Sequence, residues 1–139
     1  MRLRRTSRHA KRRSKRRVAA EELRGETLIT YPVPPQRIDF IREVLEPAGV
    51  KLQRRTAELT IAILQLVASR RGIAALPDWG VKSYVDHDYV LAKRIGAKGL
   101  WSDLYAIVSR TQSKRPYIPD FMAIVRQICA SELDRIELL

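Results

Sequence analysis

The stretch formed by residues 64–77 constrains what this chain can fold into more than any other. It passes from an apolar helical pattern to Gly72, continues as the short apolar run 73–76, and closes at Pro77. Glycine tolerates the left-handed backbone that turns a chain out of a helix, so Gly72 predicts the helix end. The apolar run after it predicts a short buried strand. A helix that leads directly into a buried strand indicates an α/β fold.

The rest of the chain alternates between strand and helix patterns in the same way. We expect a short polar helix at 18–24, strands at 27–31 and 50–55, and helices at 38–45 and 57–68. Beyond Pro77 the pattern predicts helical turns at 79–85, strands at 89–95 and 104–109, and a helix from Pro119 to about Leu133. The order predicts one parallel sheet that contains 27–31, 50–55 and 73–76, with helices packed on it.

The net charge of +12 is concentrated at the amino terminus. Ten of the 27 basic residues lie among the first seventeen positions, and removing them leaves 17 basic against 15 acidic residues. We therefore expect residues 1–17 to be a disordered basic tail and residues 18–139 to be the folded domain. Two interpretations stay open: a leader without a role, or an arm that binds nucleic acid nonspecifically and with steep salt dependence. The arm would use Arg4, Arg5, Arg8, Lys11, Arg12, Arg13, Lys15, Arg16 and Arg17.

Catalytic and metal-binding patterns are weak in this sequence. The single cysteine, Cys129, has no nearby histidine and is predicted to be a small buried residue. Asp86, His87 and Asp88 are adjacent, and adjacent side chains diverge, so a solvated turn is favoured over a metal site. Trp79 and Trp101 are predicted to seal core edges. The sequence predicts no enzyme activity, no metal and no cofactor, and without a membrane-length apolar run or signal peptide it predicts a cytoplasmic protein.

Four blocks, in order along the chain, resemble the second half of the effector-binding domain of LysR-type transcriptional regulators. They are residues 26–32, 45–50, 67–77 and 99–108. Their details look most like the branch that regulates methionine biosynthesis with homocysteine as co-effector. The resemblance implies a periplasmic-binding-protein-like (Rossmann-like) effector subdomain, a sheet flanked by helices, and possible homodimerisation. It covers only the last two-fifths of the family pattern, so we expect a fragment without the helix-turn-helix and without the facing half of the ligand cleft.

In such folds, ligands lie against strand ends and helix amino termini, where unpaired N–H groups attract anions. The resemblance therefore implies a site for a small amino-acid-like effector, with homocysteine as the candidate. Thr56 and Thr60 have an alternative role as caps of the helix that follows. The effector-binding residues implied are Tyr31, Pro32, Val33, Thr56, Glu58, Leu59, Thr60, Ile73, Ala74, Leu76 and Pro77.

Three functions compete. The leading hypothesis is the ligand-sensing domain of a LysR-type regulator, with DNA contacted through a helix-turn-helix outside this sequence. The alternative is a stand-alone basic nucleic-acid-binding protein that acts through its tail, and a third is a solute-binding module of the same fold. If the leading hypothesis holds, the carboxyl-terminal helix is expected to expose the face formed by Phe121, Ile124 and Ile128.

Overall fold

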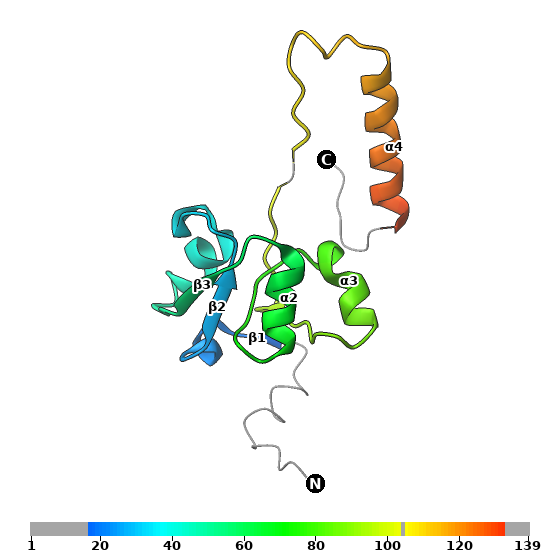
Figure 1. Ribbon diagram of the computed structural model, residues 1–139. Helices are drawn as coiled ribbons and strands as arrows, with labels where there is room; N and C mark the ends of the chain where they lie inside the picture. Colours follow the sequence, from blue (N-terminus) through cyan, green and yellow to red (C-terminus); the bar gives the residue numbers. More distant parts are fainter. Residues whose placement is uncertain (1–16, 104, 133–139) are drawn as a thin grey trace. The chain divides into compact units, whose positions relative to one another are not determined.

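The structure is a computed structural model that describes residues 17–103 and 105–132. The chain divides after Ser102 into two units (Figure 1). The first unit holds β1 (Arg17–Val18), η1 (Ala20–Leu23), β2 (Thr27–Thr30), η2 (Pro35–Arg37), η3 (Phe40–Leu45), β3 (Gln53–Thr56), α2 (Thr60–Ala68), α3 (Asp78–Asp86) and β4 (Arg94–Ile95). The second unit holds α4 (Tyr117–Glu132).

The first unit is built on a parallel pairing of β2 and β3. On the other edge of β2, Ile73 forms a parallel bridge to Leu28. The Ile73 N–H donates to the Thr27 carbonyl and the Ile29 N–H donates to the Ile73 carbonyl, each at 2.8 Å. Parallel neighbours require crossover connections, which η3 and α2 provide. The prediction that 27–31 and 73–76 pair in parallel is confirmed at Ile73 alone, as an isolated bridge beside the two-stranded β2–β3 sheet.

Two of the three predicted strands differ in extent from the structure. The run 73–76 makes a single bridge and is half-buried, so the prediction of a fully buried strand is wrong. The strand predicted at 50–55 is β3, which begins at Gln53 and not at Val50. Val50 is buried in the core, and its N–H donates to the Leu45 carbonyl to close the turn after η3. This turn keeps the chain out of the sheet for three more residues.

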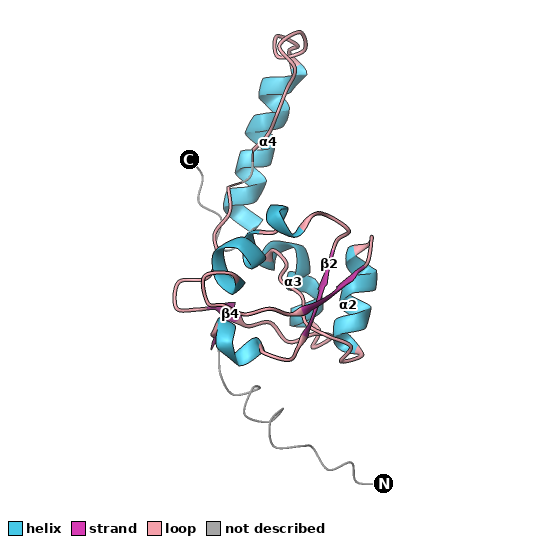
Figure 2. Ribbon diagram, turned by 90° about the vertical axis from the view of Figure 1, so that its left-hand side faces the viewer, coloured by secondary structure: helices cyan, strands magenta, loops and turns pink. Residues whose placement is uncertain are grey.

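Successive β2 side chains point to opposite faces, which divides the core into two layers. Leu28 packs in a cluster with Ala20, Leu23, Phe40, Leu45 and Val50, supplied by η1, η3 and the turn after η3. Ile29 and two α2 residues, Ile63 and Leu64, are buried outside that cluster. Figure 2 shows α2 beside the strands, as the predicted helix-flanked sheet requires.

The residue that ends α2 is not the predicted one. Arg70, not Gly72, has the positive φ of 60°. The Arg70 N–H donates to the Val67 carbonyl and the Arg71 N–H donates to the Leu66 carbonyl, both at 2.9 Å. This pair of hydrogen bonds is the Schellman pattern of a helix end. Gly72 has another role: a Cβ at this position would overlap the Thr27 carbonyl oxygen. Glycine is therefore required here for close backbone approach and not for its left-handed conformation.

The segments after α2 match their predictions unevenly. The helical turns predicted at 79–85 are confirmed as α3. Of the strand predicted at 89–95, only Arg94–Ile95 forms, in parallel with β1. Arg17, predicted to be the last tail residue, therefore lies in a strand. Trp79 and Trp101 are 47% and 55% exposed, so the prediction that they seal core edges is wrong.

In the second unit, residues 105–109 have no regular structure, so the strand predicted at 104–109 is wrong where the chain is described. Helix α4 begins two residues before Pro119 and has no buried residue among those described. Cys129 is half-buried, not buried. The expected exposed face of Phe121, Ile124 and Ile128 is confirmed. No helix in the described part of the chain has the length and apolar character needed to cross a membrane.

Candidate functional site

The carboxyl edge of the β2–β3 pair is the place where most of the predicted effector residues meet. Tyr31, Pro32 and Val33 follow β2 directly, and Thr56 is the last residue of β3. The Ala57 N–H donates to the Thr30 carbonyl at 2.9 Å, which extends the pairing by one residue. Glu58 and Leu59 then lead into the first turn of α2. The parallel topology therefore brings two segments separated by more than twenty residues to one edge.

A side-chain contact joins these two segments. The Tyr31 and Thr60 hydroxyl oxygens are 2.5 Å apart, which links the end of β2 to the first residue of α2. Capping of α2 by a threonine, the alternative role for Thr56 and Thr60, is wrong. Leu59 occupies the cap position and makes no side-chain cap bond. The first N–H groups of α2 therefore have no side-chain cap, and such groups attract an anion.

Arg54 is a residue of this edge that the sequence analysis missed. Its Nε donates to Thr30 Oγ1 at 2.8 Å, and its Nη2 donates to the carbonyls of Val33 at 2.5 Å and Tyr31 at 3.3 Å. Arg54 is the register partner of Leu28, whose side chain lies in the core. A charged residue at such an inward register position needs polar partners, and this requirement was the available signal.

The contacts of Arg54 and Thr60 fix the segment after β2 at two points. Arg54 holds the backbone carbonyls of Tyr31 and Val33, while the Tyr31 ring reaches the α2 amino terminus. Thr30, the one buried polar residue among those described, adds a bond from its Oγ1 to the Tyr31 carbonyl at 3.0 Å. The segment is therefore a shaped edge, although Tyr31 and Val33 themselves are exposed.

The third predicted group is connected to this edge less directly. Ile73 pairs with the first half of β2, and the parallel direction carries residues 74–77 toward the same edge. Figure 1 shows α3, which starts at Asp78, beginning at the same end of the unit as α2. In residues 17–103, however, no hydrogen bond joins Ala74, Leu76 or Pro77 to Tyr31 or Thr60. The structure thus brings two of the three groups into direct contact.

A separate hollow of about 520 Å³ lies elsewhere in the same unit. Half of its lining residues are alanine or glycine, and it contains none of the predicted effector residues. It is bounded by Ala19, Ala20, Glu21, Glu43, Val44, Ile95, Gly96, Ala97, Lys98 and Gly99. We place the candidate site at the carboxyl edge instead, because that edge combines hydroxyl groups, uncapped helix N–H groups and exposed apolar surface.

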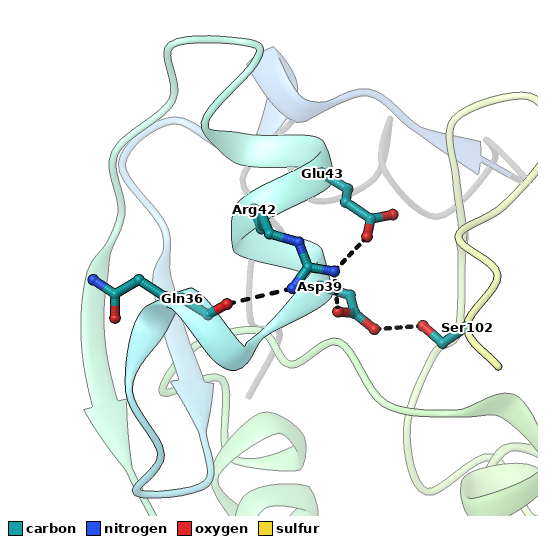
Figure 3. Close-up of polar contacts among 5 residues, drawn as sticks. All are labelled: Gln36, Asp39, Arg42, Glu43 and Ser102. Carbon is teal, nitrogen blue, oxygen red and sulfur yellow. Dashed lines mark hydrogen bonds and ion pairs between the residues drawn. The ribbon is translucent and has the colours of Figure 1, made fainter. Parts of the chain in front are cut away.

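A polar network holds the segment that leaves β4 against η3 (Figure 3). Ser102 Oγ donates to one Asp39 oxygen at 2.6 Å, and Arg42 Nη2 contacts the other at 2.7 Å. The same Nη2 lies 2.6 Å from a Glu43 oxygen, and Nη1 donates to the Gln36 carbonyl at 3.3 Å. The Ser102 hydrogen bond, and after it the charge of Arg42, lowers the pKa of Asp39 below its ordinary value.

Substitution of Ser102 by alanine is expected to raise the pKa of Asp39, because it removes the hydrogen bond that stabilises the carboxylate most. A carboxyl whose pKa is lower in the folded than in the unfolded chain stabilises the fold above its ordinary pKa. That contribution is lost as the pH falls through the folded value.

Carbon-detected NMR titration of the Asp39 carboxyl measures the shift. Ser113→Ala, which removes only a bond to the Arg110 carbonyl, is the control, and an unchanged Asp39 titration in Ser102→Ala would contradict the assignment.

Asp86, His87 and Asp88 form the solvated end of α3. Asp86 pairs with Lys82 at 3.0 Å, and the His87 ring is hydrogen-bonded to the Ser83 carbonyl at 2.7 Å. These side chains are directed to their own helix. The predicted nucleic-acid contacts from Arg4 to Arg16 lie outside the described residues, whereas Arg17 is exposed in β1.

The chain matches one protein family and curated transcriptional regulators over most of its length. The LysR substrate binding domain family matches residues 6–130. Over 120 residues, the chain is 42% identical to the HTH-type transcriptional regulator MetR of Haemophilus influenzae and 39% identical to that of Escherichia coli K12. Each alignment covers 86% of this chain but only 39% and 38% of the relative. The chain thus spans about two fifths of the length of these curated relatives.

A solved structure has the same fold at similar identity. It is the regulatory domain of MetR, a LysR family regulator from N. meningitidis, determined as a cysteine-to-serine double mutant. The superposition has a TM-score of 0.76 at 44% identity and covers 91% of this chain and 60% of that one. The unmutated form of the same domain gives a TM-score of 0.72 at 46% identity.

Proposed function

Because the chain belongs to the LysR substrate-binding domain family, we propose that it is the ligand-sensing part of a MetR-type transcriptional regulator that controls methionine biosynthesis. The relatives are HTH-type transcriptional regulators, and the aligned region is about two fifths of each. In this proposal DNA is bound by a helix-turn-helix outside the aligned region, and the described unit is one half of a periplasmic-binding-protein-like, helix-flanked domain. Pairing of two such regulators as a homodimer belongs to the same proposal.

The observation that carries the proposal is the contact between Tyr31 and Thr60 at the carboxyl edge. Open parallel sheets bind ligands outside the carboxyl ends of their strands, where helices begin. The residues that the family resemblance implied for effector binding at Tyr31–Val33 and Glu58–Thr60 lie on both sides of this contact. The arrangement supports recognition of a small ligand that combines charge with a short apolar part.

We further propose homocysteine, or a related small amino acid with a thiol, as the effector. Its carboxylate suits the uncapped N–H groups of α2, and its ammonium group suits Glu58, which is exposed two residues before α2. Leu59 and Val33 offer exposed apolar surface to the short thiol-bearing chain. The groups that recognise the ligand thus come from the segment after β2 and from the turn before α2.

The isolated chain is expected to bind homocysteine weakly, with a dissociation constant of about 1 mM or higher. The edge is open, and small ligands reach high affinity only in sites that enclose most of their surface. A molecule with few heavy atoms cannot compensate by its size. Titration calorimetry of the purified chain measures the affinity. Tight, saturable binding by this chain alone would show that more of the cleft is present than we propose.

A further inference from the structure

The segment after β2 has few groups of its own that could fix its shape. Three of the five residues 31–35 are prolines, which have no N–H to donate. The Val33 N–H donates to the Tyr31 carbonyl at 2.8 Å, which closes a three-residue turn around Pro32. The fixed φ of proline suits the central position of such a γ-turn. Within residues 31–35, all of which the structure describes, this is the one backbone hydrogen bond.

Arg54 supplies the donors that this turn lacks. Its Nη2 donates to the carbonyls at both ends of the turn, at 2.5 Å to Val33 and at 3.3 Å to Tyr31. Its Nε donates to Thr30 Oγ1 at 2.8 Å, directly before the turn. The planar guanidinium holds these donors at fixed angles, so it also fixes the three acceptors relative to one another. A lysine ammonium is a single nitrogen on a flexible stem and cannot reproduce this fork.

Arg54 reaches the turn from the face of the sheet on which Leu28 lies. The two are register partners, and Leu28 packs with residues of η1 and η3. Thr30 points to the same face as Leu28, because alternate side chains of a strand share a face. The Tyr31 hydroxyl instead meets Thr60 in the first turn of α2. Arg54 therefore holds the turn through its backbone, while the Tyr31 ring is directed to α2.

We propose that Arg54 is a positioning residue of the effector site, which fixes the turn at residues 31–33 so that Tyr31 reaches Thr60 before a ligand binds. This inference rests on the proposed function, because that function supplies the ligand for the edge. A site whose parts are already in place loses less conformational freedom on binding, so its affinity is higher. Arg54 acts through the turn and not through contact with the effector.

The test compares Arg54→Met and Arg54→Lys with Arg55→Met in the complete chain. Arg54→Met keeps an unbranched apolar stem without a donor, and Arg54→Lys keeps the charge without the fork. Arg55 is exposed and is the register partner of Ile29, so the control removes the same side chain from the other face of β3. Because Arg54 is half-buried, urea unfolding establishes that each variant is folded. The lysine variant keeps the test decisive if the methionine variant does not fold.

Two NMR signals report on the turn in the absence of ligand. They are the exchange of the Val33 amide hydrogen with water and the chemical shift of the ring carbon that carries the Tyr31 hydroxyl. We expect Val33 exchange to accelerate about fivefold in both Arg54 variants, because the hydrogen-bonded turn opens more often. The Tyr31 signal should move toward its position in Thr60→Val. Homocysteine binding should weaken about threefold, and Arg55→Met should change none of the three.

Unchanged Val33 exchange and Tyr31 shift in folded Arg54→Met would overturn the proposal, and so would equal changes in Arg55→Met. Full retention of both signals in Arg54→Lys would overturn it too, because a single charge would then suffice. Altered signals with unchanged homocysteine affinity would show that Arg54 shapes the turn without positioning it for the ligand. If the unsubstituted chain does not bind homocysteine, the proposed effector is wrong, while the two ligand-free signals still decide whether Arg54 fixes the turn.

Discussion

Substitution of Gly72 by alanine is expected to destabilise the first unit by about 1–3 kcal/mol or more. The added Cβ would overlap the Thr27 carbonyl oxygen and press on the Ile29 side chain at 3.0 Å. The obstacle is backbone, and it cannot move freely because the Thr27 carbonyl accepts the Ile73 N–H at 2.8 Å. Relief of the overlap would require breaking the bridge that attaches residues after α2 to β2.

Urea unfolding followed by circular dichroism measures this effect, and Gly80→Ala is the matched control. Gly80 lies within α3, and a Cβ there meets nothing within 4 Å. Alanine in a helix is favoured over glycine by about 1 kcal/mol, so Gly80→Ala is expected to stabilise the protein slightly. The two variants make the same glycine-to-alanine change, once with backbone overlap at residue 72 and once without it at residue 80. Equal or greater stability of Gly72→Ala would contradict the close approach of residue 72 to β2.

Substitution of Ile63 by alanine is expected to cost about 2–5 kcal/mol of unfolding free energy. Ile63 is completely buried between α2 and the sheet, and removal of three carbon atoms leaves a cavity that the surrounding side chains fill only in part. The substitution also weakens the attachment of α2, whose first residue, Thr60, contacts Tyr31. Stability and the shape of the candidate site should therefore be lost together.

Ile61→Ala is the control for this prediction, because it removes the same atoms from the same helix at a position that is 49% exposed. We expect it to cost less than about 1 kcal/mol, since little apolar surface leaves the core. Urea titration of both variants gives the comparison. Similar losses in the two variants would mean that α2 is not packed on the sheet as described.

In the first half of the chain, the sequence predicted β2 and α2 correctly because their signals are local. The β-rich run closed by Pro32 is β2, and the broad apolar stripe after Ala57 is α2. The prediction at Gly72 named the right residue for the wrong reason. A left-handed residue at a helix end is a local property, and Arg70 adopts it. The close approach of Gly72 to Thr27 depends on two segments that meet only in the folded sheet.

The errors in the second half have a different physical cause. The strand at 104–109 and the core-sealing role of the tryptophans were predicted from composition. Composition indicates what a segment can form when a neighbouring segment is present. Tyr105 and Ile107 have strand composition, but the described chain gives them no partner strand. Trp79 and Trp101 are large enough to seal a core, yet about half of each side chain is exposed among the described residues. Composition alone does not show whether a partner strand or a covering side chain is present in the fold.

The candidate site was predicted in part. The topology placed Tyr31 and Thr60 at one edge, as the parallel order required, and the structure adds their direct contact. Arg54 was missed because Arg54 and Arg55 are adjacent in the predicted strand, and the sequence does not show which of the two faces inward. Only the strand register shows that Arg54 is the neighbour of Leu28 and therefore reaches Thr30 and the carbonyls after β2.

The most direct test of the central claim is to titrate homocysteine into the complete chain and follow its amide signals by NMR. This measurement locates even weak binding residue by residue. The account predicts gradual shifts concentrated at Tyr31–Val33 and Glu58–Thr60, which Thr60→Val reduces. Shifts that cluster instead around Ala20 and Gly96, in the separate hollow, would contradict the assignment of the effector site to the carboxyl edge.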